Sequence, residues 1–252
     1  PSASVVQDAA AFLQPIDAVG NVILCRDLTL TGYDKNNPLT VDYSDVVIDL
    51  NGHSLTIGAR SAFRIEGENV VIKNGAFNLE EAGYGMTLSG AKNARIENVT
   101  MKGSLNATQG TTVTLKDVVI VSTGAYNICA QEGSTVTVES GTFIKDVIQG
   151  GYANYMIYVR AGYYYYGTVD PGEGFGKEPE DKSNIMPASR VILKNGADQI
   201  KFQSACGDSL LLSEEGGKDS GWTSGGVAYY CYDFASGILE NPHSIAVENT
   251  AA

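Results

Sequence analysis

The densest group of side chains that could perform chemistry lies between residues 42 and 68. Its acidic members are Asp42, Asp45, Asp49, Glu66 and Glu68, and the basic residues close by are Arg60 and Arg64. Carboxylate oxygens are the ligands that Ca²⁺ prefers, and a basic side chain that faces them could accept a proton from a bound molecule. The alternative is that these are solvated charges at strand corners, because Glu66 and Glu68 flank Gly67. We favour the second interpretation, so the sequence predicts neither a catalytic residue nor a metal site here.

Aromatic side chains form a second group, with a potential role in binding. Seven tyrosines fall between residues 152 and 166, and one of them is Tyr158. The candidates for an interface or a glycan-binding surface are Tyr152, Tyr155, Tyr163, Tyr164, Tyr165, Tyr166 and Trp222. Alternate residues of a strand point to opposite sides, and exposed tyrosine rings suit a subunit contact or a sugar platform. The alternative is that these rings pack beneath residues 167–187.

Cysteine spacing predicts neither a metal centre nor a cofactor. Cys25, Cys129, Cys206 and Cys231 are far apart, with no C-x-x-C pair and no histidine nearby, so zinc-ribbon spacing is absent. We favour buried free thiols. The alternative is one or two disulfides, with Cys206 and Cys231 as the first pair to consider, and spacing alone does not decide between the two.

Composition and charge narrow the range of partners. The 252 residues are 43% hydrophobic and carry a net charge of −12 with a pI near 4.5. Such a surface repels phosphate backbones and anionic lipids, so nucleic acid and membrane surfaces are poor candidate partners. No apolar stretch approaches the ~20 residues of a membrane helix. The start at Pro1 and Ser2, with no basic segment before an apolar run, favours intracellular synthesis without an export signal.

An internal repeat decides the expected architecture. Six segments share one pattern, in which a short apolar strand ends in a small polar turn residue and a second strand follows; they begin at Asp49, Ile72, Ile96, Leu115, Val138 and Val159. The offsets between them are 23, 24, 19, 23 and 21 residues. A third strand ending in glycine precedes each unit, as in residues 63–67. Three short strands per repeat at a nearly constant offset predict coils that stack in parallel.

Equivalent positions should then form columns along the stack. A bulky residue recurs three positions after the turn, as Phe77, Met101, Ile120, Phe143 and Tyr164. The residue before the turn alternates in charge, as Lys73, Glu97, Lys116, Glu139 and Arg160. Opposite charges on neighbouring strands stabilise by about 0.2 to 1 kcal/mol, whereas stacked like charges repel. We therefore predict that the five charged residues lie one above another.

The pattern also predicts how the chain is divided. Residues 1–20 are expected to cap the first coil, with a short helix over 4–14 that places Val5, Ala9, Phe12 and Leu13 on one face. Coils of the β-helix fill residues 21–166. Residues 167–187 are too rich in glycine, proline and charge to hold a core, so a surface excursion is expected there. Residues 188–252 resume the pattern at 191–196 and then end in an irregular C-terminal region.

With residues 46–57, Val-Val-Ile-Asp-Leu-Asn-Gly-His-Ser-Leu-Thr-Ile, leading into such coils, the chain resembles the pectate-lyase-like superfamily over residues 5–200. The resemblance implies a single-domain, all-β, right-handed parallel β-helix. Enzymes of that superfamily cut polysaccharides, either by Ca²⁺-assisted elimination or with paired carboxylates. The hydrolases need an Asp-Asp pair and a Gly-His-Gly segment, but this chain has no Asp-Asp, and its His53 lies between Gly52 and Ser54. His53 is therefore interpreted as a corner residue.

We expect a non-enzymatic structural or adhesion protein, with glycan binding as one role. Within that class we favour a homotrimeric component of a virion surface, such as a capsid decoration, fibre or tailspike, because related β-helices form such shafts. The alternatives are an extracellular glycan-binding protein of the bacterial cell surface, and a polysaccharide lyase or hydrolase that uses Asp45 and Arg64.

Overall fold

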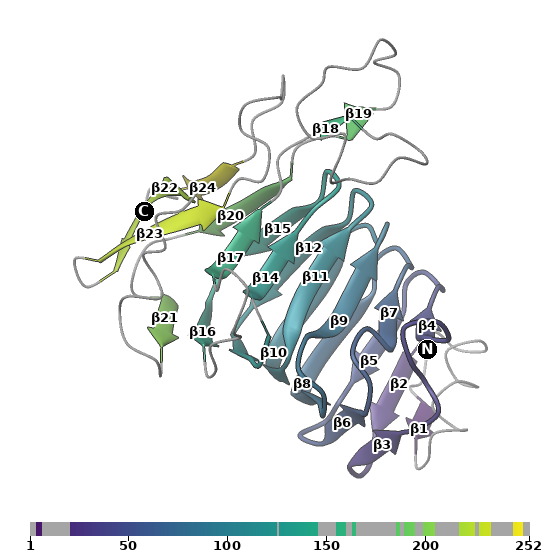
Figure 1. Cartoon of the computed structure of the whole chain (residues 1–252). Coiled ribbons are helices and arrows are strands. Elements are labelled where there is room, and N and C mark those ends of the chain that lie inside the picture. Colours follow the sequence, from purple (N-terminus) through teal and green to yellow (C-terminus); the bar gives the residue numbers. More distant parts are fainter. Residues whose placement is uncertain are drawn as a thin grey trace.

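The protein is an all-β solenoid in which successive coils stack in parallel (Figure 1). The computed structural model describes residues 4–6, 21–124, 126–145, 155–159, 163–164, 185–186, 189–194, 199–204, 217–224, 227–232 and 244–248. Within the described part of residues 21–159, each coil contributes a strand, or part of a longer strand, to each of three faces. Faces 1 and 2 belong to one 14-stranded sheet, and face 3 is an eight-stranded sheet.

The strand order within each face follows the chain from coil to coil, with one exception at the end of face 3. Face 1 contains β1 (Ser4–Val6), β2 (Asn21–Leu24), β5 (Val47–Asp49), the first part of β8 (Val71–Leu79), the first part of β10 (Ala94–Lys102), β12 (Thr112–Lys116), β15 (Thr135–Val138), β20 (Arg190–Lys194) and β24 (Ser244–Glu248). Face 2 contains β3 (Leu28–Leu30), β6 (Ser54–Ile57), the second parts of β8 and β10, β13 (Val118–Ser122), β16 (Gly141–Lys145) and β21 (Ile200–Ser204). Face 3 contains β4 (Leu39–Val41), β7 (Phe63–Ile65), β9 (Tyr84–Ser89), β11 (Ser104–Thr108), β14 (Tyr126–Ala130), β17 (Tyr155–Val159), β23 (Val227–Tyr232) and β22 (Gly217–Ser224). The exception is β22, which lies beyond β23 and pairs with it antiparallel.

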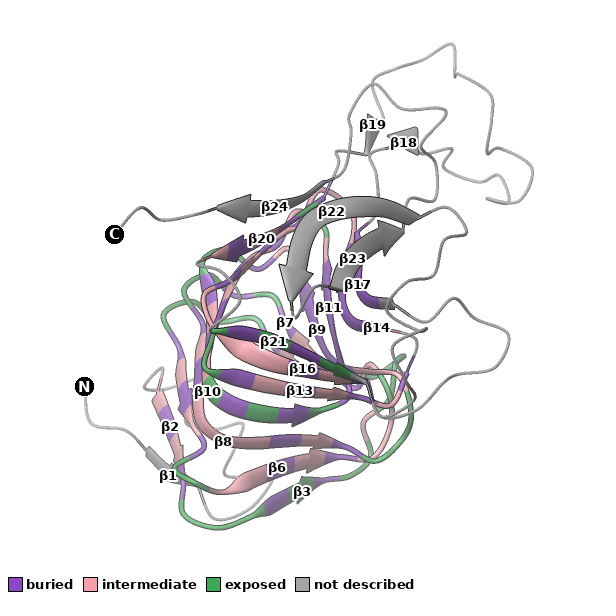
Figure 2. Ribbon diagram, turned by 90° about the vertical axis from the view of Figure 1, so that its left-hand side faces the viewer, coloured by how far each residue is buried: buried purple, intermediate pink, exposed green. Residues whose placement is uncertain are grey.

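The interior is a set of apolar columns, as the repeat predicts. On face 1, Ile48 pairs with Ile72, Ile72 with Ile96, and Ile96 with Leu115. All four side chains are at most 2% exposed, and the purple inward positions of Figure 2 follow the same alternation. Phe77, Met101, Ile120 and Phe143 form the predicted column on face 2. Strand residues alternate between the two sides of the sheet. Every second residue therefore points inward, and because these residues are apolar they form a continuous core.

A single left-handed residue makes each of three successive corners between faces 1 and 2. Asn74, Asn98 and Asp117 have φ of 61°, 52° and 52°. Asparagine and aspartate tolerate this region better than other non-glycine residues do. In the coil below, the corner is longer, because Asn51 and Gly52 both have positive φ and the His53 amide donates to the Leu50 carbonyl. The chain therefore turns from face 1 to face 2 at the asparagine positions of the repeat.

A buried polar network shapes the corner between faces 2 and 3. Ser104 Oγ lies 3.3 Å from Ser122 Oγ, and both hydroxyls donate to the Tyr126 carbonyl. Lys145, only 1% exposed, donates from Nζ to the Gly124 carbonyl. Buried polar groups need such partners, and these contacts fix the backbone where Tyr126 enters face 3.

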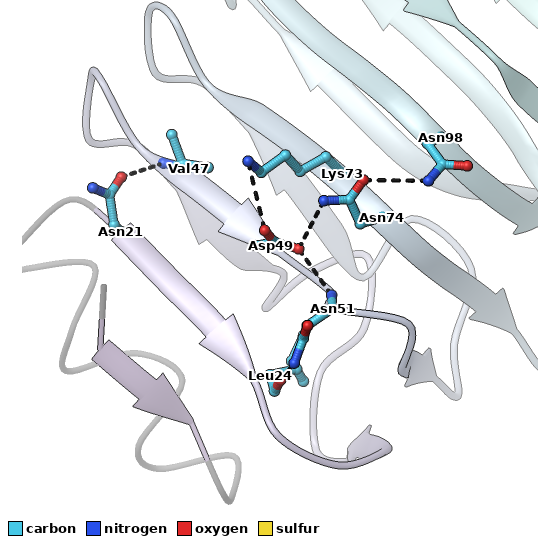
Figure 3. Close-up of polar contacts among 8 residues, drawn as sticks. All are labelled: Asn21, Leu24, Val47, Asp49, Asn51, Lys73, Asn74 and Asn98. Atoms are coloured by element: carbon cyan, nitrogen blue, oxygen red, sulfur yellow. Dashed lines mark hydrogen bonds and ion pairs between the residues drawn. The ribbon is translucent and has the colours of Figure 1, made fainter. Parts of the chain in front are cut away.

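The charged column is confirmed in its first steps and corrected in its last. Lys73 pairs with Glu97, and Glu97 with Lys116. Asp49 extends the column downward, with its Oδ2 3.5 Å from Lys73 Nζ (Figure 3). Above, the predicted member Arg160 lies outside the described residues, and the strand just before it, residues 155–159, stacks on face 3 and not on face 1.

Lys194 takes the place predicted for Arg160. Val138 pairs with Leu193, so Lys194 follows Glu139 in the column, and Lys194 pairs in turn with Glu248. On face 2, Phe202 pairs with Phe143 where Tyr164 was predicted, with ring centroids 5.5 Å apart. The charges of the column still alternate in sign with Lys194 in this place. The electrostatic reason for the column therefore holds, although the sequence-based prediction named the wrong residue.

We predict that Lys73→Glu lowers the free energy of unfolding by about 1 kcal/mol, since it places an acid between Asp49 and Glu97. Urea unfolding measures the effect, which should shrink in high salt because the charges are half-exposed. Lys102→Glu is the matched control, because its register neighbours Asn78 and Val121 are uncharged. Equal destabilisation by the two variants contradicts the column.

The two ends of the described chain differ from the sequence-based expectation. Ser4–Val6 form β1, which pairs in parallel with β2, so the predicted helix over 4–14 is wrong at its first residues. Residues 7–20, the rest of that expected helix, lie outside the described residues. The return of the pattern near 191 is confirmed, because β20 stacks on β15. The segment between β17 and β20 is thus inserted at a corner between face 3 and face 1.

Candidate functional site on the outer side of face 3

The acidic candidates are used in corner hydrogen bonding. Asp49 ends β5, and besides its ion pair with Lys73 its Oδ1 accepts from the Asn51 amide at 2.9 Å and from Asn74 Nδ2 at 3.1 Å (Figure 3). Asn74 Oδ1 in turn accepts from Asn98 Nδ2 at 3.2 Å. These contacts stack amide and carboxylate groups from coil to coil and occupy the oxygens that a bound ion would need.

Asp42 and Asp45 lie at a different corner, between β4 and β5. Both are exposed, and Asp45 has a φ of 60° while its Oδ1 accepts from Asn69 Nδ2 at 2.9 Å. Arg64 lies on face 3 in β7, with its Nη1 3.4 Å from Glu66 Oε1. The structure therefore places Asp49 and Arg64 on different faces. Across the described ranges, no group of three or more His, Cys, Asp or Glu side chains is arranged to hold a metal ion.

His53 lies at the corner before β6, beside Asp27 of the coil below. Its Nδ1 is 3.7 Å from Asp27 Oδ1, which also accepts from the Ser54 amide at 2.9 Å. The hydrogen bonds from the amide and hydroxyl of Ser54, followed by the proximity of His53, hold the pKa of Asp27 below its ordinary value. The role of Asp27 here is to hold the chain at the corner.

The lowered pKa of Asp27 has a predicted consequence for stability. Its contribution should be fully present above the ordinary aspartate pKa of about 3.9 and be lost as the pH falls through the lower folded value. A carboxyl-carbon NMR titration should give Asp27 a pKa below the ordinary aspartate value of about 3.9. A value at or above about 3.9 contradicts the assignment of these hydrogen bonds.

The predicted tyrosine surface is only partly described. Tyr152, Tyr165 and Tyr166 lie outside the described residues. Tyr155 lies in β17 and Trp222 lies in β22. Tyr163 and Tyr164 form β18 (Tyr163–Tyr164), which pairs with β19 (Ile185–Met186).

Tyr158 belongs to the same run, but its side chain is 5% exposed and stacks on Tyr126, with ring centroids 4.4 Å apart. That ring is therefore buried, and Tyr158 was not among the binding candidates. For the candidates themselves, the binding role stays a prediction.

A column of polar side chains on the outer side of face 3 was not singled out from the sequence. Register pairs Arg64 with Thr87, Thr87 with Asn106, Asn106 with Cys129, and Cys129 with Tyr158. Each of these residues lies between two inward apolar residues, as in Phe63-Arg64-Ile65 and Met86-Thr87-Leu88. Reading the middle residue of each such triplet would have revealed the column.

The middle of this polar column is buried, and half-exposed side chains lie around it on face 3. Thr87 and Asn106 are each 7% exposed, and Cys129 is fully buried. Arg64, Tyr84, Tyr126 and Gln131 are half-exposed, and Gln131 Nε2 donates to Asn106 Oδ1 at 3.0 Å. Burial, followed by the nearby thiol of Cys129, raises the pKa of Tyr84 far above its ordinary value, so its hydroxyl stays protonated. The surface layer thus combines two aromatic rings, a guanidinium and an amide.

Neither of the two cysteines whose side chains are described forms a disulfide. Cys25 is exposed and Cys129 is buried, in part agreement with the prediction of buried free thiols. Cys231 lies in β23, and Cys206 falls outside the described residues, so their predicted pairing is still open.

Comparisons with protein-family models, curated proteins and solved structures found no match for this chain. Within the part of the chain that the structure describes, no helix has the length and apolar character needed to cross a membrane. Any functional assignment therefore depends on the chemistry of the described faces.

Proposed function

We propose that this chain is a non-enzymatic structural or adhesion module, a stiff β-helical shaft that binds glycans through the outer side of face 3. The observation that carries the proposal is that the half-exposed Tyr84 and Tyr126 share face 3 with the half-exposed Arg64 and Gln131 and with a buried polar layer. Aromatic rings offer flat apolar area to a sugar, while guanidinium and amide groups bind its hydroxyls.

A binding role is favoured over catalysis because the acidic candidates do not converge. Asp49 is paired with Lys73 and with the asparagines of its corner, and Asp45 is held by Asn69. Elimination or hydrolysis needs acid, base and substrate to meet at one point. Arg64, the base of the alternative lyase mechanism, pairs with Glu66 on another face from Asp49.

We further propose membership of the pectate-lyase-like superfamily, and a place at a virion surface as part of a homotrimeric fibre, spike or capsid decoration. The parallel stacking of coils supports the first, and a continuous core suited to a rigid shaft supports the second. The alternative location is a bacterial cell surface. Isolation of the native protein should show whether it co-purifies with a particle or with a cell envelope.

Incubation with polygalacturonate, alginate and neutral glycans, with and without Ca²⁺, tests the non-enzymatic part. We expect binding without new unsaturated or reducing ends. Chain cleavage that is abolished by Asp45→Ala or Arg64→Ala would falsify it.

Sedimentation tests the assembly, with a mass of three chains expected at micromolar concentration. A mass near 26.7 kDa, that of one chain, contradicts the trimer.

A further inference from the structure

We infer that the outer side of face 3 selects a neutral saccharide over an acidic one, a step that rests on the glycan binding proposed above. The inference begins with two buried polar atoms, Arg64 Nε and Thr87 Oγ1, which have no hydrogen-bond partner in the structure. The two residues are direct register neighbours on β7 and β9. Unsatisfied buried polar atoms are rare in native proteins, so two in adjacent coils indicate an absent partner.

The two atoms define the chemistry of that partner. Arg64 Nε–H is a donor only, and the Thr87 hydroxyl can both donate and accept. One hydroxyl group can accept from Arg64 and donate to Thr87, which a sugar provides at every residue of a polymer. Thr87 is 93% buried, since it is 7% exposed, so a neighbouring side chain must move aside to admit the ligand, and the register neighbour that can do so is Arg64. Its contact with Glu66, 3.4 Å long and at the surface, is weak enough to allow this.

The charges on the face argue against an acidic ligand. Arg64 is the one charged residue within β4, β7, β9, β11, β14 and β17, and Glu66 lies against its guanidinium. The Glu66 amide donates to the Val41 carbonyl, which places Glu66 beside Asp42. The whole chain carries −12. An acidic sugar would therefore meet one cation that is already neutralised and would be repelled by the surrounding negative charge. A neutral sugar is not repelled.

The aromatic residues extend the site along the stack. Tyr126 stacks on buried Tyr158 with an interplanar angle of 11°, so its ring orientation is fixed before a ligand arrives. The Tyr84 hydroxyl lies near the Cys129 thiol. Coils repeat about every 4.8 Å, which is comparable to the length of one sugar residue in a linear polymer. A chain lying along the stack can thus contact Arg64 and Thr87 at one end and Tyr126, two coils above Thr87, at the other.

Titration of the intact protein with hexasaccharides tests the inference, followed by the NMR signals of the arginine Nε–H groups and by calorimetry. The neutral probes are cellohexaose, laminarihexaose, maltohexaose and mannohexaose, and the acidic probe is hexagalacturonate with and without Ca²⁺. We expect at least one neutral probe to bind and to shift the Arg64 Nε–H signal. Thr87→Val, which keeps the shape of the side chain, and Tyr126→Ala should each weaken it about five-fold or more. Thr114→Val on face 1 is the control and should change nothing.

The outcomes separate this inference from the proposed function. Tighter binding of hexagalacturonate than of every neutral probe overturns the selectivity while glycan binding stands. Unchanged affinity in Thr87→Val with an unshifted Arg64 signal shows that an internal water alone fills the gap, and overturns the site. If no probe of either kind binds, both the inference and the proposed glycan binding fall.

Discussion

Gly75→Ala is expected to lower the free energy of unfolding by about 3 kcal/mol, measured by urea denaturation. A Cβ at Gly75 would lie 2.4 Å from both the His53 carbonyl oxygen and Leu50 Cβ. Register places Gly75 opposite Val99, whose side chain is buried in the core. The valine is tolerated one coil higher because the two-residue turn at Asn51 and Gly52 belongs only to the coil beneath Gly75.

Gly58→Ala provides the matched control for this prediction. A Cβ there would meet only Glu80 Oε2 at 3.5 Å, an ordinary contact with a flexible side chain. That variant should be neutral or stabilising by a few tenths of a kcal/mol, because alanine reduces the freedom of the unfolded chain. Similar stability of the two variants would show that the turn at residues 50–53 does not press against face 2 as described.

Phe77→Ala is the second large effect, with an expected loss of about 3 to 5 kcal/mol in the free energy of unfolding. The side chain is fully buried, and its ring centroid lies 5.1 Å from that of Phe63 on face 3. Removing it leaves a cavity that the stacked coils above and below cannot close, because their backbones are fixed by the parallel sheet. Differential scanning calorimetry should show a much lower melting temperature.

Tyr43→Ala is the companion variant, since Tyr43 is 46% exposed at the corner after β4. It should change the stability by no more than about 0.5 kcal/mol. Comparable losses in Phe77→Ala and Tyr43→Ala would contradict the assignment of Phe77 to the shared core.

The stacking of the coils could be predicted from the sequence because the inward apolar residues and the outward charged residues both recur at a nearly constant spacing. The alternating charges of Lys73, Glu97 and Lys116 have an electrostatic reason only if these residues are neighbours on stacked strands. The structure shows that they are. The prediction failed after Lys145 for an equally physical reason. An apolar pair followed by a turn is common to all three faces, so the segment ending at Val159 reads like face 1 although it stacks on face 3.

The candidate site could be predicted only in part. Arg64 was singled out, but for a catalytic role together with carboxylates that include Asp49, which the fold places on another face. Tyr84 and Tyr126 were missed because they occur singly, whereas the run from 152 to 166 is conspicuous. Their common face depends on the register of β9, β11 and β14, which includes an irregularity at Ser104 and Leu105 that no simple period encodes.

The central claim, parallel stacking of the coils in register, is tested most directly by disulfide formation in the variant Thr114→Cys, Thr137→Cys. These two residues pair across β12 and β15. Their separation of one coil, about 4.8 Å, lies within the range that a disulfide spans. Mild oxidation and peptide mapping should link positions 114 and 137 in high yield, and should not link 114 to 142 in Thr114→Cys, Thr142→Cys, since Thr142 lies on face 2. A link between 114 and 142, with none between 114 and 137, contradicts the account.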